Sequence, residues 1–209
     1  MRVRVMNKPI INLIFLENSA MCRDMLETAV KNPNFTKIAI VTLDDNFADE
    51  LNEMYSESKV VSAIYVMSEV AVKELMTVKE KLFNYEIKTI GSYILNLDLV
   101  ESAQYSNVKK LAGETIELAI IINEVFKESL IESKGRFLWV LPYYQSEIRA
   151  NNGIHSAYYT GLERFIRSSD RALQGSNVKT ITYHLKNPSS YSSLLKYENI
   201  IKMLLSDLV

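Results

Sequence analysis

The stretch Lys134–Leu173, KGRFLWVLPYYQSEIRANNGIHSAYYTGLERFIRSSDRAL, decides the fold. It opens with an apolar run, Phe137–Leu141, whose aromatic and branched residues predict a buried strand. A polar loop with Asn151, Asn152 and Gly153 follows. Apolar residues then recur at the spacing of an amphipathic helix, at Tyr158, Leu162, Phe165, Ile166 and Leu173. A buried strand, a loop and a helix form one half of a parallel crossover unit.

The same alternation of strands and helices runs through the rest of the chain. Further strands are expected at Ile10–Leu16, Lys37–Leu43, Val60–Met67, Ile87–Leu95 (weakened by Gly91) and Val178–Leu185. Helices are expected from Asn18 or Ser19 to about Val30, and over 47–55, 69–83, 107–133 and 192–206. This order predicts an α/β fold: a doubly wound, Rossmann-like parallel sheet of about six strands with helices on both faces. Residues 1–209 are long enough for one such domain.

Composition excludes several classes of partner. The chain of 209 residues has a net charge of −1, which argues against nucleic acid or an anionic membrane held by bulk electrostatics. No apolar run approaches the roughly 20 residues of a membrane span. Cys22 is the only cysteine, so no intrachain disulfide can form, and a cytoplasmic location is the simplest setting.

The sequence resembles the short-chain dehydrogenase/reductase superfamily. In that family a GRIVNISS strand leads through a loop to a YxxxK helix and then to another strand. The stretches of this chain that resemble them are, in order, GRFLWVLP, HSAYY, GLERFIRSSDRAL and NVKTITYHL. The stretch LAGETIELAIIINEVFKESLIESKGRFLWVL looks like the family's NxxG helix running into its fifth strand. The resemblance implies the doubly wound fold and, in an active member, reduction with NADP or NAD.

The cofactor turn departs from the family pattern. FLENSAMCR stands in the place of TGxxxGxG, with Leu16, Ala20 and Cys22 at the three glycine positions. Those glycines permit the tight turn, close approach to pyrophosphate and close helix–strand packing. Three side chains are expected to crowd the phosphate and Glu17 to repel it, so no cofactor is expected to bind in the usual mode.

Two acidic residues after the second strand are weak candidates for a ribose contact. Asp44 and Asp45 could mimic the family's acidic residue at this position, but both also suit the N-terminus of the next helix. Helix capping is the favoured interpretation.

The four catalytic positions have also changed. Lys110 stands at the asparagine of NxxG, Pro142 at the serine, His155 at the tyrosine and Tyr159 at the lysine of YxxxK. The family's chemistry needs an acidic hydroxyl whose pKa is lowered by a nearby ammonium. His155 could act as an acid because imidazole titrates near neutrality, although an ordinary structural histidine is favoured. Neither the histidines nor Cys22 show metal-ligand spacing.

The helix around ETIELAIIINEVF gives the best positive indication of function in the sequence. At 100° per residue its apolar side chains point nearly all the way round, which predicts burial on both sides. In the family that it resembles, this helix and the next one pack against a partner. We therefore expect a homo-oligomer, or a complex with a catalytic reductase, through an interface that includes Ile116, Ile120, Phe126, Gly161 and Phe165. Coverage by the chain's own elements is the alternative.

Three functions remain open from the sequence. The leading hypothesis is a non-catalytic relative of the reductases that acts as a structural or interaction subunit. The second is a divergent NAD(P)-dependent, ketoreductase-like oxidoreductase with an altered site around His155, Tyr158 and Tyr159. The third is a small-molecule binding module that uses the same cleft without turnover.

Overall fold

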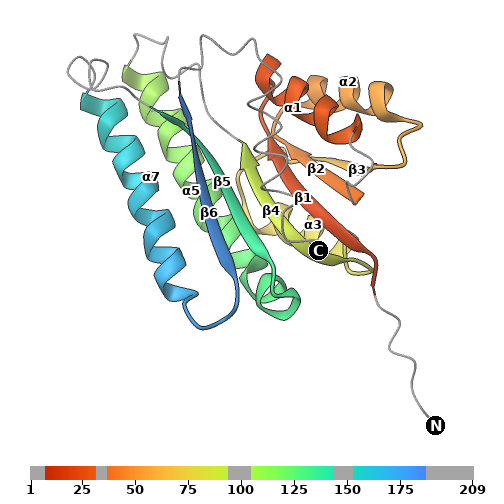
Figure 1. Ribbon diagram of the computed structural model, residues 1–209. Coiled ribbons are helices and arrows are strands. Elements are labelled where there is room, and N and C mark those ends of the chain that lie inside the picture. Colours follow the sequence, from red (N-terminus) through yellow and green to blue (C-terminus); the bar gives the residue numbers. More distant parts are fainter. Residues whose placement is uncertain (1–7, 32–36, 94–104, 144–152, 187–209) are drawn as a thin grey trace.

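A single six-stranded parallel sheet forms the centre of the molecule (Figure 1). The computed structural model describes residues 8–31, 37–93, 105–143 and 153–186. Neighbouring strands lie in the order β3-β2-β1-β4-β5-β6, and every pairing is parallel. The strands are β1 (Ile10–Leu16), β2 (Lys37–Thr42), β3 (Val61–Val66), β4 (Glu86–Tyr93), β5 (Arg136–Tyr143) and β6 (Lys179–Lys186).

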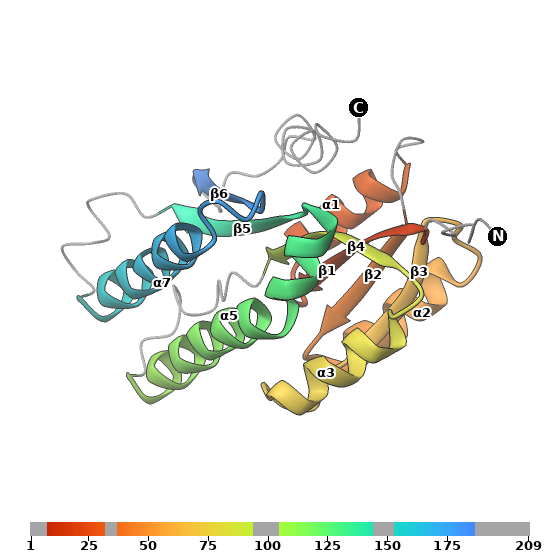
Figure 2. The ribbon, with the colours of Figure 1, turned by 90° about the horizontal axis from the view of Figure 1, so that it is seen from below.

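Helices cover both faces of this sheet (Figure 2). One face is packed by α1 (Ala20–Lys31) and α2 (Asp45–Tyr55). The other is packed by α3 (Val72–Lys81), α5 (Tyr105–Ser133) and α7 (Gly153–Ala172). Within the described residues no helix is both long and apolar enough to cross a membrane.

Alternate residues of each central strand pack into two separate hydrophobic cores, one on each face of the sheet. Leu13 and Phe15 of β1 pack toward α3 and α5, whereas Ile14 and Leu16 pack toward α1 and α2. Successive strand side chains point to opposite faces, so burial on both sides produces the continuous apolar runs seen in the sequence. The predicted doubly wound α/β architecture is confirmed.

Two expectations differ from the structure. Gly91 does not interrupt β4, because it is paired in mid-sheet between Ile14 of β1 and Leu138 of β5. Helix α3 begins at Val72 rather than Glu69, since Ala71 has extended backbone angles (φ −141°, ψ 145°). The predicted helix over 192–206 falls outside the described residues.

The end of α5 is fixed by a tight backbone reversal. Lys134 adopts a left-handed conformation with φ 50°, and the Gly135 N–H donates to the Leu130 carbonyl at 2.8 Å. These are the features of a Schellman motif, which ends a helix by satisfying its last carbonyls. The chain then enters β5 directly at Arg136.

Candidate functional site

The turn between β1 and α1 holds the sequence-predicted cofactor positions. Leu16 and Cys22 are buried in the core between the sheet, α1 and α2. The expectation that they crowd a phosphate needs correction, because both side chains pack in this core. Ala20 begins α1, and its side chain lies outside the described part of the structure. The described residues between β1 and α1 are therefore Glu17, Asn18 and Ser19.

The sequence predicts Asn18 or Ser19 as the cap of α1, and in the structure the cap is Ser19. Its hydroxyl accepts from the Cys22 N–H at 3.3 Å, and its carbonyl accepts from the Arg23 N–H at 3.1 Å. An α-helix begins with unpaired N–H groups, which is why a helix start can bind phosphate. Here the side chain of the protein already satisfies one of them.

Asp44 is the second fixed point of this region. One carboxylate oxygen accepts from the Phe47 N–H at 3.0 Å, which makes Asp44 the N-cap of α2. The other accepts from Asn18 Nδ2 at 2.7 Å. These bonds, led by the one from Asn18, hold the pKa of the Asp44 carboxyl below its ordinary value. Capping, the favoured interpretation of Asp44, is confirmed, and Asp45 is an exposed residue in the first turn of α2.

Arg23 joins α1 to α2 and to the turn. Its guanidinium donates to Glu50 Oε1 and to Asn18 Oδ1, and its Cζ lies 4.9 Å from the centre of the Phe47 ring. The result is a continuous polar network from Glu50 through Arg23 and Asn18 to Asp44. Sequence reasoning missed it because Arg23 and Glu50 are 27 positions apart and neither belongs to a motif.

The thiol of Cys22 lacks the properties of a reactive cysteine. Burial, followed by the nearby Glu17 carboxylate, raises the pKa of Cys22 to about 12. A thiolate is the reactive form of cysteine, so a thiol with this pKa is a poor nucleophile near neutral pH. Among the described residues no group of three or more histidine, cysteine, aspartate or glutamate side chains could hold a metal ion.

The four catalytic positions fall on three elements. Lys110 lies in α5, Pro142 in β5, and His155 and Tyr159 in α7. The backbones belong to described elements, but these four side chains lie outside the described part of the structure. The parallel register places Pro142 opposite Leu185 of β6, near the carboxyl edge of the sheet, the edge at which open α/β sheets bind ligands.

Helices α5 and α7 lie side by side on the sheet (Figures 1 and 2), with α5 against β4 and α7 against β6. Ile120 is 41% exposed on the outer side of α5, whereas Ile116 and Phe165 are half-buried and pack against the chain's own core. A methyl group at Gly161 would stand 3.7 Å from Ile116 Cδ1, so Gly161 is a contact between the two helices of one chain.

Phe126 does not belong to this outer surface. It is fully buried among the chain's own core residues, as are Ile122 and Leu130. Helix α5 lies on the sheet between α3 and α7, so three of its sides are covered within the chain. The apolar residues all round α5 are thus largely explained without a partner, and Ile120 is the one exposed member of the predicted interface set.

The outer faces of the two helices carry opposite charge. Glu117, Glu124 and Glu128 are exposed on α5 on either side of Ile120. The exposed positions of α7 include Arg164, Arg167 and Arg171. We call the three glutamates the acidic ridge and the three arginines the basic ridge, and the two helices that carry them lie beside each other (Figure 2).

Comparison with known proteins identifies solved structures with the same fold. No family profile matches the sequence, and no curated protein matches it. Solved structures do match. A short-chain dehydrogenase/reductase from Vibrio parahaemolyticus aligns with a TM-score of 0.70 at 10% identity, covering 95% of this chain and 93% of that one. The fold is that of the short-chain dehydrogenase/reductase superfamily.

Two further structures with the superfamily fold align over most of their length. A metagenomic short-chain oxidoreductase in complex with NADP has a TM-score of 0.66 at 7% identity, covering 93% of this chain and 90% of that one. A short-chain dehydrogenase from Streptomyces avermitilis has a TM-score of 0.57 at 10% identity, covering 92% and 78%. At these identities the likeness establishes the fold of this chain and leaves its chemistry to its own residues.

Proposed function

We propose that this chain is a non-catalytic homologue of the short-chain dehydrogenases/reductases that acts as a structural or interaction subunit. One observation carries the proposal: in the region after β1, where an active relative would receive its nucleotide, Asn18 and Asp44 are bonded to each other. The fold is retained, and the groups that the family's chemistry requires are replaced.

The residues present do not fit a dinucleotide in the family's manner. The Ser19 hydroxyl already accepts the Cys22 N–H at the start of α1, where pyrophosphate is expected. Both oxygens of the Asp44 carboxylate already accept hydrogen bonds from the protein, and these bonds would compete with a ribose hydroxyl for the carboxylate. Glu17 adds a carboxylate to a turn that would have to receive phosphate.

The residue types at the catalytic positions support the same proposal. Proline has no side-chain donor, so Pro142 cannot orient a carbonyl as a serine does. Tyr159 carries no positive charge with which to lower the pKa of a neighbouring acid. Reduction through the family's proton-donating system is therefore not expected.

The outer face of α5 and α7 is the surface that we assign to assembly. It combines the exposed Ile120 with an acidic ridge beside a basic one. In a two-fold arrangement, the acidic ridge of one copy can face the basic ridge of the other. We favour a homodimer over a complex with a catalytic reductase, because the self-complementary charge pattern requires no second protein.

Nucleotide titration tests the proposal directly. Isothermal titration with NAD, NADH, NADP and NADPH should show no binding at millimolar ligand. A dissociation constant in the low micromolar range would overturn the proposal and favour a divergent oxidoreductase. An Asp44→Ala variant would then show whether the carboxylate contacts the ribose, because it should weaken such binding.

An activity assay provides the second arm. The protein supplied with NADPH and simple ketones, ketoesters or acyl thioesters should not consume cofactor above background. Turnover would contradict the proposal, and a His155→Phe variant would then decide whether the imidazole had replaced the missing acid. Loss of turnover in that variant would assign the role to His155.

A further inference from the structure

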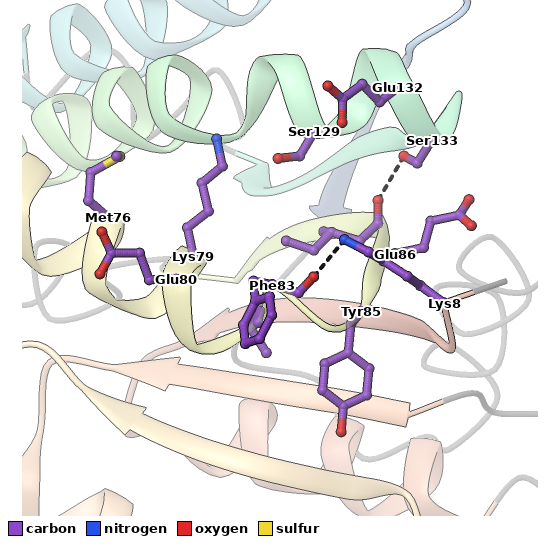
Figure 3. Close-up of a pocket in the computed structure, with 12 residues that line it drawn as sticks. Lys8, Met76, Lys79, Glu80, Phe83, Tyr85, Glu86, Ser129, Glu132 and Ser133 are labelled. Carbon is purple, nitrogen blue, oxygen red and sulfur yellow. Dashed lines mark hydrogen bonds between the residues drawn. The ribbon is translucent and has the colours of Figure 1, made fainter. Parts of the chain in front are cut away.

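A cleft of about 660 Å³ opens at the amino-terminal edge of the sheet (Figure 3). Its walls come from the C-terminal turns of α3 and α5, the start of β4 and Lys8. The β1–α1 turn follows the carboxyl end of β1, so the cleft is separate from the site described above. Small-molecule sites in proteins have volumes of roughly 300–1,000 Å³, and this cleft lies within that range.

Apolar side chains are open to solvent within the cleft. Phe83 is 66% exposed and Met76 is 41% exposed, and both line it. Figure 3 shows Phe83 at the bend between α3 and β4, with Met76 further back along α3. Exposed apolar surface in a concave site with polar groups around it favours the binding of an apolar group.

Two ammonium groups line the same cleft and keep their positive charge. Lys8 Nζ donates to the Phe83 carbonyl at 2.6 Å, and Lys79 Nζ donates to the Val125 carbonyl at 2.7 Å. Figure 3 shows the Lys79 side chain reaching from α3 toward α5. An ammonium group has three N–H donors, so each lysine can still donate to a second acceptor such as a carboxylate.

Carboxylates balance these positive charges. Glu80 and Glu132 line the cleft, and both are exposed. Glu86 lines it too, but its Oε1 lies 3.9 Å from the Lys88 ammonium, which offsets its charge. Glu132 belongs to the last turn of α5, where the carbonyl end of the helix adds partial negative charge. This part of the cleft therefore suits an ammonium group.

The balance of charge selects the kind of ligand. A ligand with a single charge is attracted by two of the four groups, the two lysines or the two glutamates, and repelled by the other two. A zwitterion can turn each of its charges toward the opposite sign. Within the described residues no ion pair joins Lys8 or Lys79 to Glu80 or Glu132, so these charges have not already paired with one another.

Lys79 and Glu132 lie close enough for one short molecule to contact both. The Lys79 ammonium is bonded at Val125, and Glu132 follows seven residues, about 10 Å, further along α5. Side chains of a helix lean toward its N-terminus, which brings the Glu132 carboxylate back toward Val125. An α-amino acid carries its ammonium and carboxylate on one carbon, and a hydrogen bond of about 3 Å at each end lets it span the remaining distance.

We propose that this cleft binds a free amino acid with a large apolar side chain. That side chain rests against Phe83 and Met76, the carboxylate accepts a hydrogen bond from Lys79, and the ammonium group faces Glu132. The site shares no residue with the β1–α1 turn or with the outer surface of α5 and α7. Its test is therefore independent of the function proposed above.

Titration of the full-length chain with phenylalanine and three relatives tests the proposal. Phenylalanine amide keeps only the positive charge, N-acetylphenylalanine keeps only the negative charge, and glycine keeps both charges without the apolar side chain. By isothermal titration calorimetry at low salt, phenylalanine should bind about tenfold more tightly than each relative, because each lacks one group that the cleft contacts.

The same titrations can overturn the proposal. No binding of phenylalanine at millimolar concentration would do so, as would equal affinity for phenylalanine and either single-charge relative. Tighter binding of the amide would also refute it, and would assign the cleft to the amino terminus of a peptide.

Three variants locate the binding. Phe83→Ala should weaken phenylalanine binding and leave glycine binding unchanged, Lys79→Gln should remove the preference over the amide, and Glu132→Gln should remove the preference over N-acetylphenylalanine. Lys73→Gln and Glu53→Gln are matched controls, because both side chains are exposed and neither lines the cleft. Phe83 and Glu132 are exposed, so their substitutions should leave the circular dichroism unchanged. Cleft variants that bind phenylalanine as the parent does, or controls that weaken binding equally, would refute the site.

Discussion

Asn18 Nδ2 donates to Asp44 Oδ2 at 2.7 Å, and this bond ties the turn after β1 to the N-cap of α2. The Arg23 guanidinium donates to Oδ1 of the same Asn18 amide and to Glu50 on α2. The amide is thus used as both donor and acceptor, which fixes its orientation. The polar side chains that follow the first two strands are thus bonded to one another.

Replacing Asp44 with alanine should destabilise the protein. The change removes the cap of α2 and the acceptor of Asn18, and loss of a cap alone costs about 1 kcal/mol. Urea denaturation of Asp44→Ala should show a lower midpoint. The matched control is Asp45→Ala, which removes an exposed acidic residue one position later and should cost less. Equal costs for the two variants would argue against the network.

Stability should fall in acid partly through Asp44. Its folded-state pKa lies below the ordinary value, so its contribution is present above the unfolded pKa of about 3.9 and is lost as the pH falls through the folded pKa. Asp44→Asn keeps a capping side chain without this titration. The stability difference between the parent and Asp44→Asn should therefore shrink as the pH is lowered from 6 into this range, when followed by urea denaturation. A constant difference would contradict the assignment.

Gly135→Ala should be strongly destabilising. The added methyl group would stand 2.7 Å from the Lys88 carbonyl oxygen and 2.7 Å from Leu130 Cδ2, closer than such contacts allow. Overpacking of this kind costs about 1–3 kcal/mol. Gly113→Ala is the matched control, because nothing described lies within 4 Å of its methyl group and removing a helical glycine gains about 0.5–1 kcal/mol. Chemical denaturation of both variants should give shifts of opposite sign.

Ile120→Glu should dissociate the proposed assembly. The side chain is 41% exposed in the single chain, so the substitution should leave the fold intact, whereas burying an isoleucine in an interface is worth about 1.5–3 kcal/mol. Light scattering should change from dimer to monomer. Met54→Glu, on α2 and 56% exposed, should leave the assembly unchanged. A parent protein that is already a soluble monomer at micromolar concentration would refute the assembly.

Cys22 should resist thiol reagents until the protein unfolds. Burial raises its pKa to about 12, compared with an unfolded value of about 8.5. At pH 8.5 the unfolded thiol is about half ionised, while the folded thiol is almost wholly protonated. Labelling with a chromogenic disulfide should be slow in buffer and fast in guanidinium chloride. The raised pKa also means that stability contributed by the protonated thiol is lost as the pH rises above the unfolded value.

The sheet could be predicted because parallel strands covered on both faces give continuous apolar runs. Ile10–Leu16 and Phe137–Leu141 were readable for this reason, and the structure contains both within its central strands. The capping role of Asp44 was readable from its place just before a helical pattern. These features depend on neighbouring residues, which the sequence displays directly.

Other features depend on residues that only the fold brings together. The sequence shows that α5 is apolar all round, but not that α3, α7 and the sheet cover three of its sides. The sequence alone therefore predicts Phe126 in an interface, although it is buried within the chain. The link from Arg23 to Glu50 is likewise a product of packing, and no local sequence pattern predicts it.

The position of β1 in the strand order also shapes how the chain emerges during synthesis. β1 pairs with β2 on one edge and with β4 on the other, and Ile10 meets Glu86. A nascent chain that has reached β3 can complete only the first of these edges. Until β4 leaves the ribosome, β1 presents an open row of backbone donors and acceptors flanked by apolar side chains, which is a template for wrong pairing. The interval between β3 and β4 is thus when β1 is open to such wrong pairing.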